Sequence, residues 1–192
     1  QMKGPRVGLL GFSKGAEVCL AMAAFLKNIM AVASSEHSLC DCYIDSSLLP
    51  RIKTHTVALH EHKTKATNSE FLDYSDVVED LFQAPGNQSL IPLEKAEAQF
   101  LFIVGQDDRV VKSEYYATEV GKLLQAQGKG NFQILSCPGT GHCIDPPFFP
   151  LYPIGSHPVF QKRAVLGGEL RPYSKAQVHA WSQIQAFFKK YL

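Results

Sequence analysis

Short continuous apolar runs and runs with helical spacing alternate along this chain. The apolar runs predict strands at residues 7–10, 29–33, 100–104 and 132–137; the run at 29–33 predicts a buried strand, and the run at 100–104 is the clearest of the four. Helical spacing predicts one helix after residue 13, a second over 113–127 with Ser113 as N-cap, and a third over 174–192. The expected buried stripes are Val18, Met22, Phe25, Leu26 and Ile29 in the first helix and Val178, Trp181, Ile184 and Phe188 in the third. This alternation predicts an α/β fold, a mainly parallel sheet with flanking helices on both faces.

The alternation breaks down between about residues 34 and 95, where polar and charged residues interrupt the pattern. We interpret this stretch as a lid-like insertion with a helical phase only around residues 71–82. The length of 192 residues suits a single domain over 1–192. Because the first predicted strand begins almost at the first residue, we expect a truncated, partial domain whose N-terminal strands are missing.

Charge and composition narrow the class of protein. The formal net charge is +1 and no block of like charges occurs, so we expect neither nucleic acid nor an anionic membrane surface as a partner. No apolar run is long enough for a membrane span, and the first residues do not form a signal peptide. The five cysteines are irregularly spaced, which favours reduced thiols in an intracellular, cytoplasmic protein. A peroxisomal or mitochondrial location stays open.

Residues 11–15, Gly-Phe-Ser-Lys-Gly, form a Gly-x-Ser-x-Gly motif between the first predicted strand and the first predicted helix. This layout is typical of a nucleophile elbow, a sharp strand-to-helix turn that presents the serine. The motif alone is weak, because its three fixed residues occur by chance in roughly 6% of chains of this length. The strand before it and the helix after it strengthen the prediction that Ser13 is a nucleophile. Both glycines are expected to let strand and helix approach closely.

Candidate partners of Ser13 follow two later strands, at the carboxyl ends where parallel sheets carry their reactive residues. Asp107 and Asp108 come after the third predicted strand, and His142 comes after the fourth. The chain order of serine, acid and histidine is that of α/β-hydrolases and differs from the orders in chymotrypsin and subtilisin. The sequence therefore predicts a catalytic triad at one edge of the sheet.

Two details of this candidate site depend on turn geometry. We favour Asp108 over Asp107, because the turn at Gly105 needs a residue or two before a side chain swings back toward a histidine. The glycines beside His142 are expected to leave room for its ring to approach the serine. The backbone N–H of Lys14 is the expected oxyanion donor, since it follows the nucleophile at the start of a helix.

Longer runs match one family in its own order, at residues 9–15, 25–27, 89–96, 100–108, 112–114, 138–147, 167–169, 174–177 and 180–181. They resemble the C-terminal α/β-hydrolase domain of the type-I acyl-CoA thioesterases and the bile acid-CoA:amino acid N-acyltransferases. The resemblance implies a triad of Ser13, Asp108 and His142 and an acyl-CoA partner. It also implies a longer protein, with an N-terminal β-sandwich and further sheet strands ahead of the elbow. Residues 34–88 match poorly, with Ser34-Ser35-Glu36-His37 where the family has an Ile-Asn-Gly-like stretch.

We therefore predict hydrolysis of fatty acyl-CoA thioesters to free fatty acid and CoA. A competing hypothesis is acyl transfer to glycine or taurine. The family's conjugating enzyme typically carries cysteine as nucleophile, and an acyl-serine ester is a poorer acylating agent for amines, so Ser13 favours water as acceptor. Two further hypotheses stay open. The chain could be a truncated, non-catalytic family member, because the resemblance places half of the oxyanion hole ahead of it, or it could be a generic carboxylesterase.

No metal or other cofactor is expected, because hydrolysis by a serine, a histidine and an aspartate needs none. Cys40-x-Cys42 lacks the spacing of a zinc-binding pair, and no second pair follows it. His60-x-His62 is a weak candidate for a metal site, because no acidic residue on a nearby strand accompanies it. The oligomeric state does not follow from the sequence.

Overall fold

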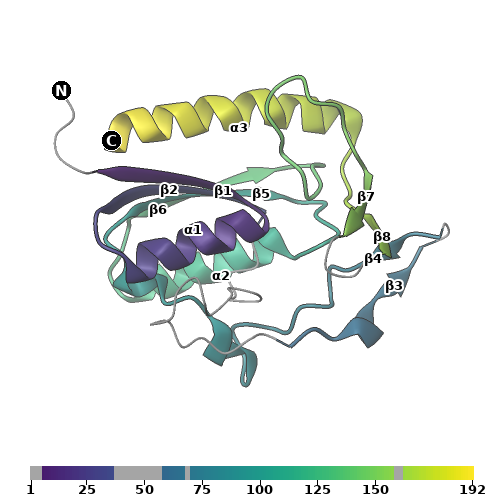
Figure 1. Cartoon of the computed structure of the whole chain (residues 1–192), viewed down its shortest axis with the longest axis horizontal. Coiled ribbons are helices and arrows are strands. Elements are labelled where there is room, and N and C mark those ends of the chain that lie inside the picture. Colours follow the sequence, from purple (N-terminus) through teal and green to yellow (C-terminus); the bar gives the residue numbers. More distant parts are fainter. Residues whose placement is uncertain (1–5, 37–57, 68–69, 158–161) are drawn as a thin grey trace.

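The computed structural model describes residues 6–36, 58–67, 70–157 and 162–192. The Cys40 and Cys42 pair lies outside these residues. In chain order the elements are β1 (Val7–Phe12), α1 (Lys14–Phe25), β2 (Ile29–Ser35), η1 (Glu61–Lys63), β3 (Lys65–Ala66), β4 (Leu72–Asp73), η2 (Gly86–Ser89), η3 (Leu93–Lys95), β5 (Gln99–Gly105), α2 (Ser113–Ala126), β6 (Phe132–Cys137), β7 (Ile154–His157), β8 (Lys162–Val165) and α3 (Leu170–Tyr191) (Figure 1).

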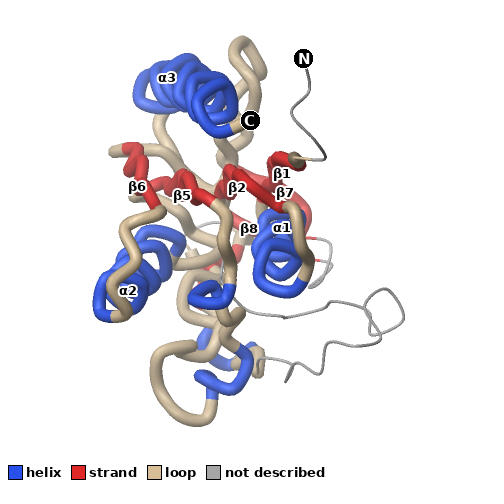
Figure 2. Tube along the Cα trace, turned by 90° about the vertical axis from the view of Figure 1, so that its left-hand side faces the viewer, coloured by secondary structure: helices blue, strands red, loops and turns tan. Residues whose placement is uncertain are grey.

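The main sheet consists of four parallel strands in the order β1-β2-β5-β6. These are the four strands that the continuous apolar runs predict. Helices α1 and α2 cover one face of this sheet and α3 covers the other (Figure 2). The prediction of a mainly parallel sheet with helices on both faces is therefore confirmed.

Strand β5 explains why its sequence is an unbroken apolar run. Phe100 and Phe102 pack in the cluster formed with α1 and α2, whereas Leu101 and Ile103 pack in the cluster formed with α3. Successive side chains of a strand point to opposite faces, so a strand covered on both sides has no polar face to show. The two core clusters hold β5 in the middle of the molecule and fix the position of the loop that follows it.

The predicted buried stripes of the first and third helices are partly wrong. In α1 the buried side chains include Ala16, Cys19, Leu20 and Ala23, while Phe25 and Leu26 are exposed. The helix ends at Phe25, so two residues of the predicted stripe lie beyond it: the backbone is extended at Leu26, and Ile29 belongs to β2. The face of α3 that meets the sheet includes Ala176, Ala180, Ile184 and Phe187, and Val178 is exposed.

A second sheet has the strand order β3-β4-β8-β7. It lies beyond the carboxyl ends of the main strands (Figure 1). Strands β7 and β8 pair antiparallel, and the hydrophobic pattern did not predict either of them. The expected helical phase at 71–82 is also wrong. Tyr74, Val77 and Leu81 are buried at helix-like spacing, but they belong to turns and irregular backbone after β4 and not to a helix.

The expected lid-like insertion at 34–95 is only partly described, because residues 37–57 lie outside the described chain. Its described part packs onto the loop after β5. The backbone N–H of Tyr74 donates to the carbonyl oxygen of Arg109, and the Arg109 guanidinium lies 3.4 Å from the Asp73 carboxylate. Among the described helices, none is both long and apolar enough to cross a bilayer.

Candidate active site

Ser13 stands at the sharp turn between β1 and α1. Its backbone has φ 49° and ψ −120°, and a positive φ is rare for a residue other than glycine. Serine is a favoured N-cap, yet this hydroxyl makes no capping hydrogen bond to the helix. The turn is anchored instead through the backbone, where the Ser13 N–H donates to the carbonyl oxygen of Ser35 at 2.9 Å. The Ser13 hydroxyl is thereby left to contact His142 instead of capping the helix.

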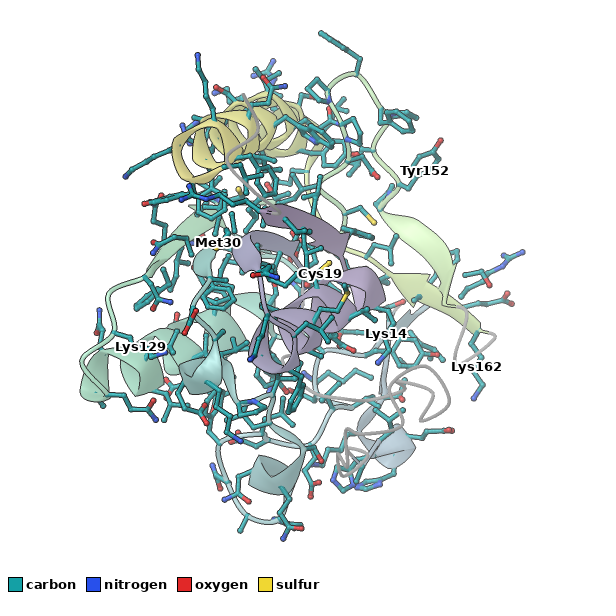
Figure 3. All side chains as sticks on the ribbon, turned by 60° about the vertical axis from the view of Figure 1, so that its left-hand side comes forward. Lys14, Cys19, Met30, Lys129, Tyr152 and Lys162 are labelled. Carbon is teal, nitrogen blue, oxygen red and sulfur yellow. The ribbon has the colours of Figure 1, made fainter. Side chains whose placement is uncertain are left out.

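The two glycines of the motif do different things. A methyl group on Gly11 would overlap the backbone of Gly15 and Ala16, so the close approach of β1 to α1 requires glycine there. A methyl group on Gly15 would meet no described atom within 4 Å. The expectation of close packing is therefore confirmed for Gly11 and wrong for Gly15. Lys14, labelled in Figure 3 at the start of α1, has a backbone N–H in the first turn, where a helix supplies no internal acceptor.

His142 is positioned by backbone packing of the loop that follows β6. Its N–H donates to the carbonyl oxygen of Leu166 at 2.7 Å. A methyl group on Gly141 would overlap the backbone of Leu166 and Gly167. The glycine next to the histidine thus permits contact between backbones, and the expectation that it makes room for the ring is wrong.

The structure brings Ser13, His142 and Asp108 together in one hydrogen-bonded row. Ser13 Oγ lies 3.0 Å from His142 Nε2, and His142 Nδ1 lies 3.1 Å from each carboxylate oxygen of Asp108. His142 and Asp108 are buried, and the Phe12 ring lies 5.7 Å from the His142 ring between centroids. With the proton on Nδ1, His142 donates to Asp108 and accepts from the Ser13 hydroxyl. This arrangement can remove a proton from Ser13 and hold the resulting imidazolium against a carboxylate.

The Asp108 carboxylate is held in its ionised form. Its Oδ1 accepts hydrogen bonds from the backbone N–H groups of Val110 and Val111, at 2.9 and 3.1 Å. Burial acts to raise the pKa of Asp108, but the neighbouring His142 and these backbone donors outweigh burial and leave the pKa below its ordinary value. Asp108 is therefore a negative charge fixed beside His142.

Asp107, the second candidate acid, points elsewhere. Its Oδ1 accepts from the Arg109 guanidinium, whose Nε lies 2.7 Å away, and its Oδ2 accepts from the backbone N–H of Gly168 at 2.9 Å. These contacts tie the loop after β5 to the segment before α3. The structure thus places Asp108, and not Asp107, against the histidine.

Glu36 is a fourth side chain at this site, and no sequence motif assigns it a role. Only 1% of the residue is exposed, and its Oε2 accepts from the Gly105 N–H at 3.3 Å and from the Ser113 hydroxyl at 3.2 Å. Ser113 was expected to be an N-cap, but α2 takes Lys112 at that position and makes no side-chain cap there. A usable signal was present, because Glu36 follows a buried strand just as Asp108 does.

The site also has ligand atoms close enough together to bind a metal ion. One such atom each of Glu36, Asp108 and His142 lies within 4.8 Å of the others. Both ring nitrogens of His142 already face Ser13 and Asp108. A metal ion bound at His142 would replace one of these hydrogen bonds. The geometry therefore fits proton transfer better than metal coordination.

An apolar cavity of about 230 Å³ adjoins the elbow between β1 and α3, and its lining includes Gly11, Phe12, Ile144 and Trp181. Small-molecule sites usually have volumes of roughly 300–1,000 Å³. The cavity lined by the described residues is slightly below that range.

The whole sequence, residues 1–192, matches the protein family described as "BAAT / Acyl-CoA thioester hydrolase C terminal". The chain belongs to this family. It is 44% identical over 196 residues to acyl-coenzyme A thioesterase 6 of Homo sapiens, and this match covers 100% of the chain and 45% of that protein. Its fold is accordingly that of an α/β-hydrolase, as the sequence predicts.

Two more relatives in the family have names that include an organelle. The chain is 43% identical over 197 residues to the mitochondrial acyl-coenzyme A thioesterase 2 of Homo sapiens, a match of 100% of the chain and 40% of that protein. It is 42% identical over 197 residues to the peroxisomal succinyl-coenzyme A thioesterase of Mus musculus, at 100% and 45% coverage. The chain therefore spans less than half the length of these family members.

Proposed function

We propose that the full-length protein hydrolyses fatty acyl-CoA thioesters, with Ser13 as nucleophile, His142 as general base and Asp108 as the acid that orients the histidine. This proposal rests on two contacts of His142. Its Nε2 lies 3.0 Å from Ser13 Oγ, and its Nδ1 lies 3.1 Å from the Asp108 carboxylate. Membership of a thioester hydrolase family supports the same substrate class.

The reaction follows from these positions. Ser13 Oγ attacks the thioester carbonyl carbon while His142 Nε2 takes the hydroxyl proton, and Asp108 stabilises the imidazolium that results. The backbone N–H of Lys14 donates to the carbonyl oxygen as it becomes negative. The carbon–sulfur bond then breaks, and the imidazolium proton passes to the departing CoA sulfur. A water molecule, deprotonated by His142, then attacks the acyl-serine ester. The bond between the acyl carbon and Ser13 Oγ breaks, the proton on His142 passes to Oγ, and the fatty acid leaves.

Water is the acceptor that the local chemistry favours. An ester on Ser13 is less reactive toward amines than a thioester on cysteine would be. Two thiols lie close to the site, but burial raises the pKa of Cys137 and that of Cys143 to about 12, so both stay protonated near neutral pH. Ser13 is thus the nucleophile that His142 activates.

We also propose the wider setting of this site. The chain forms one hydrolase domain, and part of its lid-like insertion covers the loop after β5. The contacts of Tyr74 and Asp73 with Arg109 support this placement for the described part. The insertion begins after β2 and not at residue 34, because Ser34 and Ser35 are the last residues of that strand. An intracellular location is in keeping with the mitochondrial and peroxisomal names of two relatives.

The test compares Ser13→Ala with Ser182→Ala, an exposed serine on α3, in the full-length protein. We expect Ser13→Ala to lower kcat for release of CoA from a long-chain acyl-CoA by about a thousandfold or more, and Ser182→Ala to leave it unchanged. CoA release by Ser13→Ala at the wild-type rate would refute the mechanism.

Product analysis separates hydrolysis from the competing functions. With taurine and acyl-CoA both present, mass spectrometry should find free fatty acid as the main product, whereas an N-acyl taurine would indicate acyl transfer. Faster turnover of simple oxygen esters than of acyl-CoA would indicate a general carboxylesterase. A fluorophosphonate probe that fails to label Ser13 in the folded protein would favour a non-catalytic role.

A further inference from the structure

Glu36 presents an unusual buried carboxyl group. Its Oε2 has two donors, the Gly105 N–H and the Ser113 hydroxyl, while its Oε1 is buried without a hydrogen-bond partner among the described residues. A buried carboxylate oxygen that accepts no hydrogen bond is strongly disfavoured. A proton on Oε1 would solve this problem, because the neutral carboxyl group could then donate a hydrogen bond to a nearby acceptor.

An acceptor is close by. One carboxylate oxygen of Asp108 and one oxygen of Glu36 lie within 4.8 Å of each other and of His142. Two buried carboxyl groups at this separation do not both ionise near neutral pH. Asp108 has two backbone donors and His142 to stabilise its charge, whereas Glu36 has one backbone donor and one hydroxyl. The negative charge therefore belongs on Asp108 and the proton on Glu36.

We propose that Glu36 is a positioning residue for the reaction proposed above, a neutral acid that donates its proton in a hydrogen bond to Asp108. In this state Asp108 bears the single negative charge that faces His142. The hydrogen bond also helps to fix the orientation of the Asp108 carboxylate. Glu36 acts through Asp108 and touches no reacting atom.

The surroundings of Glu36 agree with this assignment. Burial raises the pKa of Glu36 well above its ordinary value of 4.5, and the Asp108 charge raises it further. Cys137 at the end of β6 and Cys143 in the loop after it also interact with Glu36, and both thiols are protonated near neutral pH. From α2 the neighbour is Ser113, which does not titrate. Among the described residues, the charge that faces Glu36 is therefore that of Asp108.

The proposal rests on the proposed function only for its effect on the reaction, so the experiment has two independent parts. The first part needs no turnover. Infrared spectroscopy of the full-length protein labelled with ¹³C at the glutamate carboxyl should reveal a carbonyl band of an un-ionised acid near neutral pH. That band should vanish in Glu36→Gln and persist in Glu119→Gln, which removes a surface carboxyl on α2. Absence of the band in the wild-type protein would overturn the proposal.

The second part uses the pH dependence of kcat/KM. Glutamine preserves a neutral hydrogen-bond donor, so Glu36→Gln should keep the midpoint of the acidic limb within about 0.3 pH units of wild type. Were Glu36 ionised, its replacement by glutamine would remove a negative charge beside His142 and lower that midpoint by about one unit, which would overturn the proposal. Glu36→Ala should lower kcat/KM by roughly tenfold, and Glu36→Gln should recover most of this loss.

The two parts also tell the proposals apart. If acyl-CoA is not hydrolysed but the carbonyl band is present and depends on Glu36, the proposed function fails and the protonation of Glu36 stands. If hydrolysis occurs without the band, only the assignment of Glu36 fails. Should Glu36→Ala not fold, the glutamine variant and the infrared band decide the outcome.

Discussion

The backbone of Gly105, at the end of β5, packs directly against the backbone carbonyl of Gly141, so a methyl group on Gly105 would overlap that oxygen. This contact joins the loop that carries Asp108 to the loop that carries His142. The same residue also donates its N–H to Glu36. Gly105 is therefore the point at which three of the site's side chains are set relative to one another.

Replacement of Gly105 by alanine is expected to disturb both stability and the site. The free energy of unfolding should fall by about 3 kcal/mol, because the backbone has to move to admit the methyl group. The matched control is Gly130→Ala, since a methyl group there would meet no described atom within 4 Å. Chemical denaturation should show a change of less than about 1 kcal/mol for the control, and equal losses in the two variants would contradict the packing argument.

The two neighbouring aspartates should respond differently to removal of charge. Asp108→Asn is expected to lower kcat by about 10⁴, because the amide no longer stabilises the imidazolium and favours the wrong tautomer of His142. Asp107→Asn should weaken the contacts with Arg109 and Gly168 and lower the free energy of unfolding by about 1 kcal/mol, with kcat reduced less than tenfold. Steady-state kinetics and denaturation of both variants check this, and a larger loss of kcat in Asp107→Asn would reverse the assignment.

Stability should decrease with rising pH because of Glu36. The pKa of this group is raised above 4.5 in the folded protein, so the folded state holds its proton more tightly than the unfolded state. The stability that this proton contributes is complete below pH 4.5 and is lost as the pH rises toward the raised pKa. The free energy of unfolding of wild type should therefore fall relative to that of Glu36→Gln by up to about 1.4 kcal/mol per pH unit.

Parallel urea titrations at pH 5 and pH 8 measure this difference. The contribution of Asp108 to stability depends on pH in the opposite direction. Because its pKa is lowered from the ordinary value of 3.8, Asp108 stabilises the folded protein above pH 3.8, and this contribution stays constant between pH 5 and pH 8. A difference between wild type and Glu36→Gln that does not change from pH 5 to pH 8 would show that Glu36 does not hold a proton in the folded protein.

The sequence predicted the elements of the main sheet well because its signal is local. A strand covered on both faces needs a continuous apolar run, and β5 has one from Phe100 to Val104. The predicted stripe of α1 was wrong because the buried face consists mainly of small side chains, Ala16, Cys19 and Ala23, around Leu20, and a search for large apolar residues therefore selected another face. Strands β7 and β8 were missed because they are short and largely exposed, so their side chains leave no hydrophobic period.

By itself the sequence determined the order of strands and helices in the main sheet, the turn at Ser13 and the candidate residues of the site, because each of these depends on a few neighbouring positions. Tertiary structure decided the rest. The parallel register that pairs Ser35 with Ile103 places the end of β2 beside the end of β5, and so brings Glu36 against Asp108. That register is set by core packing across segments far apart in the chain, which no local pattern records. The same packing turned Asp108 toward His142 and Asp107 toward Gly168, although the two aspartates are adjacent in sequence.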